Sequence, residues 1–309
     1  MLGVVNSISR AFLDFERQYV GAFPNMRNAK KLVIASDYGG DHGDASHTTV
    51  CFLIASAASV ADWTCSQKIV RSTYLGDGRR LSYKGLNDKH KRLALAPFLA
   101  AANRLNGVVV TFLIDKRLIS LFQAVGKLDK NDPDLLNLPT WKSSSVERMF
   151  RITHIASLLL RGLSGIHQDV LWVTDEDAIV ANESRLRQFV SAFGNVASHY
   201  LSHDLGHIRV ATTASDNGTR DVEDLVAISD IVAGALTDVL ADFAVRGGFA
   251  SIGLTMPDTK TTKAKARKVM DWFSDDRHPL RRVVCVVDQG TTAKYRVSCV
   301  RFHGSSDAT

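Results

Sequence analysis

Apolar residues along the chain follow two kinds of spacing, one typical of helices and one typical of strands. Apolar positions at helical spacing, with stop or capping signals, predict helices at about 2–20, 89–105, 145–161, 183–200 and 222–244. Short apolar runs predict strands at 31–36, 48–57, 68–75, 108–114, 170–174 and 208–212. The first three strands are spaced closely enough to be antiparallel, and the later alternation of strands and helices favours parallel pairing. The pattern predicts an α/β protein.

Composition divides the chain into three regions. Residues 1–30 hold an amphipathic N-terminal helix, and residues 31–245 hold the α/β core. From about Arg246 the chain becomes rich in Gly, Thr and Lys, so residues 246–309 form a basic segment followed by a C-terminal hairpin of 282–288 with 294–302. In that hairpin Cys285 is expected to face Cys299 as a pair of free thiols.

Overall composition restricts the class of protein. The chain has 309 residues, 45% of them hydrophobic and 23% charged, which is typical of a folded globular protein. No apolar run approaches the roughly 20 residues needed to cross a bilayer. The first residues lack the pattern of a secretory signal, and the four cysteines form no C-x-x-C pair. These features predict a cytoplasmic protein without a membrane segment.

Positive charge is concentrated in two clumps, although the net charge is only +6. Residues 79–92 hold six Lys or Arg against one Asp, and residues 260–268 hold five with no acid. Such clumps attract polyanions. We expect nucleic-acid phosphates to contact Lys84, Lys89, Arg92, Lys260, Lys263 and Lys265. The alternative is that both clumps are solvated surface.

Four aspartates are the strongest candidates for chemistry. Asp37, Asp115 and Asp175 each follow an apolar strand, where the carboxyl ends of parallel strands form the ligand crevice of open α/β sheets. Asp230 lies beside the buried stripe of the last long helix, where an unpaired carboxylate is costly. Carboxylate oxygens suit Mg²⁺ or Mn²⁺, so the four predict a catalytic metal centre. Their alternative roles are turn formation and helix capping.

Two histidine-rich segments are weaker candidates. His199, His203 and His207 recur every four residues, but Gly206 is expected to break the helix that would align them for zinc. The loop after Asp37 carries potential ligands at Asp41, His42, Asp44 and His47. Phosphate-loop, dinucleotide-binding and G-x-S-x-G motifs are missing from the sequence, which disfavours ATP hydrolysis, nicotinamide redox chemistry and hydrolase-fold catalysis.

Four motifs occur in an order that resembles the ribonuclease-H-like superfamily of metal-dependent nucleases. They are Ser36-Asp37-Tyr38-Gly39-Gly40, Ile114-Asp115-Lys116, Thr174-Asp175-Glu176, and the helix segment Ala227-Ile228-Ser229-Asp230-Ile231-Val232-Ala233-Gly234. More narrowly, they resemble a largely uncharacterised bacterial family, in which Glu replaces Tyr38 and Gln replaces Ala227. The resemblance spans about residues 31–245. It implies a mixed sheet of three antiparallel strands followed by parallel strands, flanked by helices.

The resemblance and the acidic set together predict a metal-dependent nuclease that uses Mg²⁺ or Mn²⁺ to hydrolyse RNA or DNA. Mobile-element or defence contexts are implied by analogy with the family alone. Two alternatives remain open at this point. One is a binding or regulatory module that keeps the fold but cleaves nothing, and the other is a small-molecule phosphoesterase.

Overall fold

The computed structural model describes residues 2–40, 45–118, 121, 141–177, 179–245, 254–255, 263–290 and 295–303. The helices are α1 (Leu2–Gln18), α2 (Ala57–Tyr74), α3 (Lys89–Ala102), α4 (Ser143–Leu163), α5 (Glu183–Tyr200), α6 (Asp221–Val245) and α7 (Ala264–Ser274), with short 3₁₀ turns η1 (Lys84–Asn87) and η3 (Thr213–Ser215). The strands are β1 (Lys31–Gly39), β2 (His47–Ser56), β3 (Gly107–Asp115), β4 (Asp169–Thr174), β5 (Ile208–Thr212), β6 (Leu254–Thr255), β7 (Leu280–Gln289), β8 (Tyr295–Val300) and β9 (Phe302–His303).

Seven of the strands form one mixed sheet in the order β5-β4-β1-β2-β3-β7-β8. Strand β2 runs antiparallel to both β1 and β3, while β4 is parallel to β1 and β5 is parallel to β4. Strand β7 is parallel to β3, and β8 returns antiparallel to β7. The prediction of an α/β protein with a mixed sheet is therefore confirmed.

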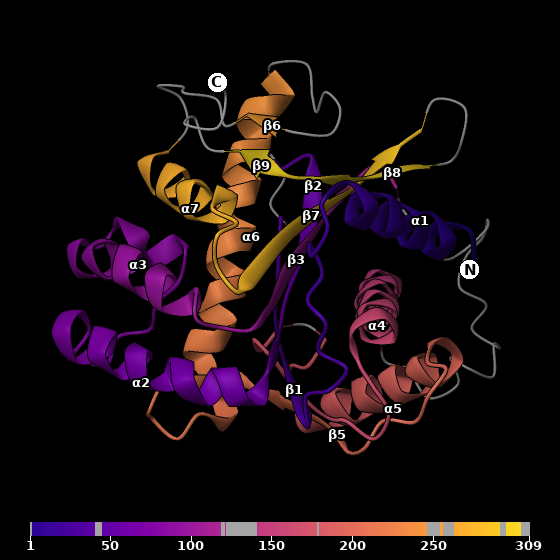
Figure 1. The fold of residues 1–309 in the computed structure, drawn as a ribbon, viewed down its shortest axis with the longest axis horizontal. Coiled ribbons are helices and arrows are strands. Elements are labelled where there is room, and N and C mark those ends of the chain that lie inside the picture. The colour runs from indigo at the N-terminus through magenta and orange to yellow at the C-terminus, as the bar shows by residue number, and fades with distance from the viewer. Residues whose placement is uncertain are drawn as a thin grey trace.

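Helices cover both faces of the sheet (Figure 1). Alternate residues of a strand point to opposite faces, so Val33 and Ala35 pack with α2, α3, α6 and α7, whereas Leu32 and Ile34 pack with α1, α4 and α5. Strand β3 is buried along its whole length, as its unbroken apolar sequence requires. Among the described residues, no helix combines the length and apolar character needed to cross a membrane.

One predicted strand is wrong. Residues 68–74 belong to α2 and Leu75 is its C-cap, and the strand that pairs with β2 on its other side is β3, over Ala55↔Gly107 to His47↔Asp115. The β-branched side chains there resemble a strand locally, but Ser56 caps the helix by accepting the Ser59 N–H. The buried residues of α2 recur at helical spacing and include Trp63 and Gln67. Tertiary burial of this face therefore outweighs local β-propensity.

The C-terminal hairpin is part of the main sheet. Residues Gly107 to Ile114 of β3 pair with Leu280 to Val287 of β7. The expected facing of Cys285 and Cys299 is confirmed by their register in β7 and β8, and both are free thiols. A segment expected as an appendix thus supplies two strands to the fold.

Candidate metal centre

Three of the four aspartates gather at the carboxyl edge of β1 and β4. Ser36 of β1 pairs with Thr174 of β4, so Asp37 and Asp175 follow matched positions on neighbouring parallel strands. Helix α6 crosses this edge, and the Ser229 hydroxyl donates to the Ala35 carbonyl oxygen at 2.9 Å. That bond fixes Asp230, the next residue of the helix, over the end of β1. The sheet register and one helix contact together assemble the cluster.

The charges of these aspartates act on one another. Burial, followed by the negative charges of Asp230 and Asp175, raises the pKa of Asp37 from 3.8 to about 7. The pKa of Asp230 is also raised, first by burial and then by the charge of Asp175, although a hydrogen bond from the Tyr83 N–H opposes the shift. The cluster therefore holds more negative charge than its surroundings neutralise.

Protein groups already contact all three carboxylates, since Asp37 has a backbone hydrogen bond from Tyr38. The Asp175 Oδ1 atom accepts from Arg80 Nη2 at 2.6 Å and from the Thr213 hydroxyl at 2.7 Å. The Asp230 Oδ2 atom accepts from the Tyr83 backbone N–H at 2.6 Å. In the described ranges, no three His, Cys, Asp or Glu side chains form a group that could hold a metal ion as they stand. The donors fit a hard divalent cation by chemistry and charge, and the contacts of Arg80 and Thr213 with Asp175 are both to Oδ1, where Arg80 would compete with an ion.

Asp115 is not brought into the cluster. Cys51 of β2 pairs with both Asp37 and Thr111, so Asp115 lies two strands away and four residues further along, about 16 Å from Asp37. Although burial alone would raise it, hydrogen bonds from the Arg117 side chain and backbone and the Gln289 N–H lower the pKa of Asp115 to about 2. The expected convergence of Asp115 with Asp37 and Asp230 fails because β2 lies between their strands.

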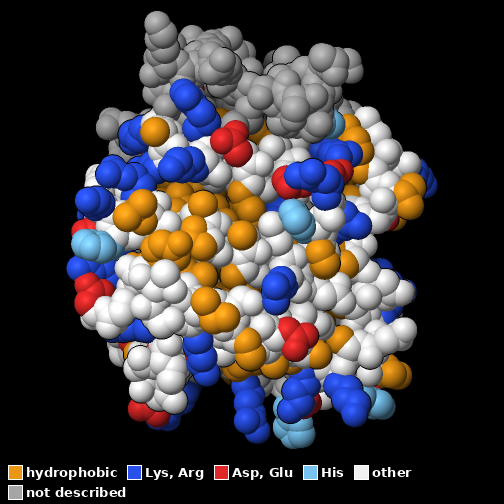
Figure 2. All heavy atoms as spheres, turned by 60° about the vertical axis from the view of Figure 1, so that its left-hand side comes forward, with side chains coloured by type: hydrophobic (Ala, Val, Ile, Leu, Met, Phe, Trp, Pro, Cys, Tyr) orange, Lys and Arg blue, Asp and Glu red, His pale blue; other side chains and the backbone are white. Residues whose placement is uncertain are grey.

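The predicted phosphate-binding residues have different environments. Lys84, Lys89 and Arg92 are exposed around η1 and the start of α3. Figure 2 shows this side of the molecule, with Lys and Arg side chains around an area of apolar ones. Lys260 lies outside the described residues. Lys263 pairs with Asp238 at 2.9 Å, and the Lys265 ammonium donates to the Tyr83 carbonyl oxygen at 3.1 Å.

Tyr83 joins the first basic clump to α6. Its hydroxyl donates to Asp238 at 2.6 Å, and the Lys265 ammonium lies 4.2 Å from its ring centroid. Gly234 makes room for the ring, because a Cβ at that position would lie 2.3 Å from a Tyr83 ring carbon. The helix segment that the sequence resemblance emphasised therefore has a structural role beside Asp230. It holds residues 79–92 against the cluster.

Replacing Gly234 by Ala is expected to destabilise the protein by about 1–3 kcal/mol, because the added methyl group overpacks against Tyr83. Urea unfolding followed by circular dichroism measures the change. Gly194→Ala is the matched control, since nothing lies within 4 Å of a Cβ at that position of α5. The control should be neutral or slightly stabilising because alanine favours helix. Equal effects of the two substitutions would contradict the packing role of Gly234.

The described histidines of the two histidine-rich segments do not form a metal site. Helix α5 ends at Tyr200, so His203 and His207 leave the helical face of His199. His199 contacts the Asn195 carbonyl, His203 contacts the Ser164 hydroxyl, and His207 lies 3.5 Å from Asp169. The expected break of that helix is confirmed. Asp41, His42 and Asp44 lie outside the described residues, and His47 contacts Asp288 at 2.9 Å.

Sequence reasoning missed three groups around the aspartates. Arg80 and Tyr83 contact Asp175 and Asp230, and the positive charge of Arg148 lowers the pKa of Asp37. Arg80 belongs to a clump that the sequence marks as basic, but nothing in its spacing indicates an acidic partner 95 positions later.

Comparison of the chain with protein-family models and with curated proteins finds no match. Function is therefore inferred from the geometry and charge of the site itself.

Proposed function

We propose that the chain is a metal-dependent phosphodiesterase that acts on nucleic acid, built on a ribonuclease-H-like core. The observation that carries the proposal is the gathering of Asp37, Asp175 and Asp230 at the carboxyl edge of β1 and β4, and the raised pKa of Asp37 supports it. Perturbed carboxylates in such a position are typical of functional sites. The strand order β5-β4-β1-β2-β3, with only β2 antiparallel to the rest, supports the proposed core.

Asp37, Asp230 and Asp175 are the residues that would hold Mg²⁺ or Mn²⁺, and Arg80 would compete with the ion for Asp175 Oδ1. When bound, the ion supplies Lewis-acid activation of water and stabilisation of the leaving oxygen. The chain's own cations bind and orient the substrate. Arg80 and Lys265 lie beside the acidic cluster, where a phosphate would be a new partner for either. Lys84, Lys89 and Arg92 are exposed, and we expect them to contact further phosphates of a polyanion bound at the cluster.

A second candidate is a module that binds nucleic acid without cleaving it. Two contacts favour this candidate, namely the Arg80 guanidinium on Asp175 and the Tyr83 N–H on Asp230. Together they compensate part of the acidic charge without an ion. If these contacts are permanent, the aspartates anchor residues 79–92 and have no catalytic role.

Metal titration separates the two candidates. At 100 times its dissociation constant, Mg²⁺ or Mn²⁺ stabilises a specific site by about 2.7 kcal/mol, which should raise the melting temperature of a protein of this size by about 4 °C. We expect this rise for the wild-type protein and its loss in Asp230→Asn, whose amide oxygen can still accept the Tyr83 N–H.

Asp115→Asn is the matched control for that titration. Because Asp115 lies outside the cluster, its substitution should keep the metal-dependent rise. A wild-type protein that neither Mg²⁺ nor Mn²⁺ stabilises would support the non-catalytic module. A rise lost in Asp115→Asn but kept in Asp230→Asn would contradict the site proposed here.

A further inference from the structure

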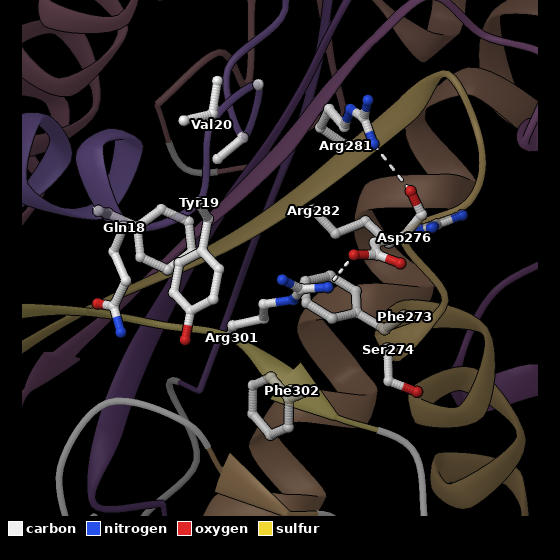
Figure 3. A pocket seen from close by; sticks show the side chains of 13 residues that line it. Gln18, Tyr19, Val20, Phe273, Ser274, Asp276, Arg281, Arg282, Arg301 and Phe302 are labelled. Atoms are coloured by element: carbon white, nitrogen blue, oxygen red, sulfur yellow. Dashed lines mark hydrogen bonds and ion pairs between the residues drawn. The ribbon is translucent and has the colours of Figure 1, made fainter. Parts of the chain in front are cut away.

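A cavity lies away from the aspartate cluster. It has a volume of about 250 Å³ and is formed where the end of α1, the end of α7, the start of β7 and the β8–β9 corner meet (Figure 3). Strand β7 is parallel to β3 and begins beside Gly107, so this cavity is at the amino edge of the parallel strands. The aspartate cluster is at the carboxyl edge, and the two sites are therefore separate.

Arginines dominate the charge of the cavity lining. Of the described residues, Arg281, Arg282 and Arg301 line it, against one acidic residue, Asp276. Arg282 is fixed in place, because it donates to the Asn103 side chain and the Asp275 carbonyl and lies over the Trp272 ring. Burial lowers the pKa of Arg282 to about 10, and within the described part of the chain its buried Nε has no hydrogen-bond partner. The described lining therefore has more positive than negative charge, and part of the positive charge is buried away from water.

The other two arginines both contact Asp276, Arg301 through the carboxylate and Arg281 through the backbone carbonyl. Arg301 pairs with the Asp276 carboxylate, which is 57% exposed, and Arg281 Nη1 donates to the Asp276 carbonyl oxygen at 2.8 Å. Figure 3 shows both side chains approaching Asp276, Arg281 from β7 and Arg301 from the corner between β8 and β9. Exposed ion pairs contribute little to stability. An oxyanion at this position would replace the Asp276 carboxylate on Arg301 and would add a contact with the Arg281 guanidinium, which donates to the Asp276 backbone carbonyl.

Aromatic rings supply the apolar walls. The Arg301 guanidinium lies 4.9 Å from the Tyr19 ring centroid, and the Phe273 and Phe302 rings pack 6.0 Å apart. Figure 3 shows these three rings around the Arg301 side chain. Arginines beside aromatic walls are suited to a ligand that has both an oxyanion and a planar apolar part.

We propose that this cavity binds a small phosphate monoester with a planar organic part, of the size of a nucleoside monophosphate. Arg281 and Arg301 bind the phosphate in place of Asp276, Arg282 supports them electrostatically, and the planar part lies among Tyr19, Phe273 and Phe302. Binding requires no metal ion, because the charge that holds the phosphate is supplied by side chains. The inference is independent of the activity proposed for the aspartates.

The test is isothermal titration with AMP in the presence of EDTA, which excludes metal-dependent binding at the aspartates. We expect Arg301→Gln to weaken AMP binding by at least about tenfold and Asp276→Asn to strengthen it by about tenfold, because the substitution removes the competing carboxylate. Arg277→Gln is the control, since that exposed arginine pairs with Asp275 outside the cavity lining, and it should change the affinity less than about twofold.

Adenosine and inorganic phosphate test the two parts of the ligand, and each alone should bind at least about tenfold more weakly than AMP. Misfolding cannot raise the affinity for AMP as expected for Asp276→Asn. This variant therefore tests the proposal even if Arg301→Gln unfolds. The proposal is overturned if AMP does not bind in EDTA. Affinities that are equal for the wild type, Arg301→Gln and Asp276→Asn, or equal binding of AMP and inorganic phosphate, would also overturn it.

Discussion

Asp37→Asn is expected to lower the proposed metal-dependent hydrolysis by at least about 100-fold while raising the stability of the metal-free protein at pH 7.5. A catalytic metal contributes several kcal/mol to transition-state stabilisation, so losing a ligand carboxylate is costly for activity. Without metal, the same carboxylate is buried beside Asp230 and Asp175, and its charge opposes folding. Hydrolysis of a labelled oligonucleotide and thermal melts in EDTA measure the two effects.

The pH dependence gives the sign of the stability effect independently. Because the pKa of Asp37 rises from 3.8 in a free carboxyl to about 7 in the folded protein, the folded state binds more protons between these values. Stability of the metal-free protein should therefore fall as the pH rises from about 4 through about 7. Asp37→Asn should reduce this fall. An unchanged pH profile, or a large loss of stability, would indicate that Asp37 anchors the backbone instead.

Arg71→Met is expected to cause the largest loss of stability, about 3–5 kcal/mol, because it leaves the buried Asp224 carboxylate without its cation. Arg71 donates to both oxygens of Asp224, at 2.6 Å through Nε and at 2.5 Å through Nη2, and Gln67 donates at 2.6 Å. The Asp224 side chain is only 1% exposed. The pair joins α2 to α6, the helix that carries Asp230. Urea denaturation at pH 7.5 measures the loss.

Arg187→Met provides the comparison for Arg71→Met. Arg187 forms an i,i+4 pair with Glu183 in which both side chains are more than 70% exposed, so its removal should cost only about 0.3–0.5 kcal/mol. Losses of similar size in the two variants would show that Asp224 is solvated and that the pair is dispensable.

The sequence was sufficient for elements whose burial pattern matches their local propensity. The helix at 183–200 and the strand at 208–212 were predicted with their exact limits. The strand predicted at 68–75 was wrong. Its Ile and Val residues favour strands, but the segment is helical, with Val70 buried and Ile69 67% exposed. No local signal distinguishes these outcomes, because the choice depends on which surface packs against α2.

The same limit applies to the candidate site. The sequence shows that aspartates follow apolar strands. It does not show which of these strands are neighbours in the sheet. Asp175 joins Asp37 because β4 pairs directly with β1, and Asp115 does not because β2 intervenes. The docking of Tyr83 against Gly234 depends on a contact across about 150 positions, so it has no periodic signature.

The pairing of β3 with β7 also has a consequence for synthesis of the chain. Gly107 pairs with Leu280, which leaves the ribosome 173 residues later. Until then β3, buried at every position in the finished protein, presents an open hydrogen-bonding edge with Val108, Val110 and Phe112 among its side chains. Such an edge is a template for association between chains. A nascent chain stalled before residue 280 should therefore depend on chaperones that bind extended apolar segments, and completion of the hairpin should end that dependence.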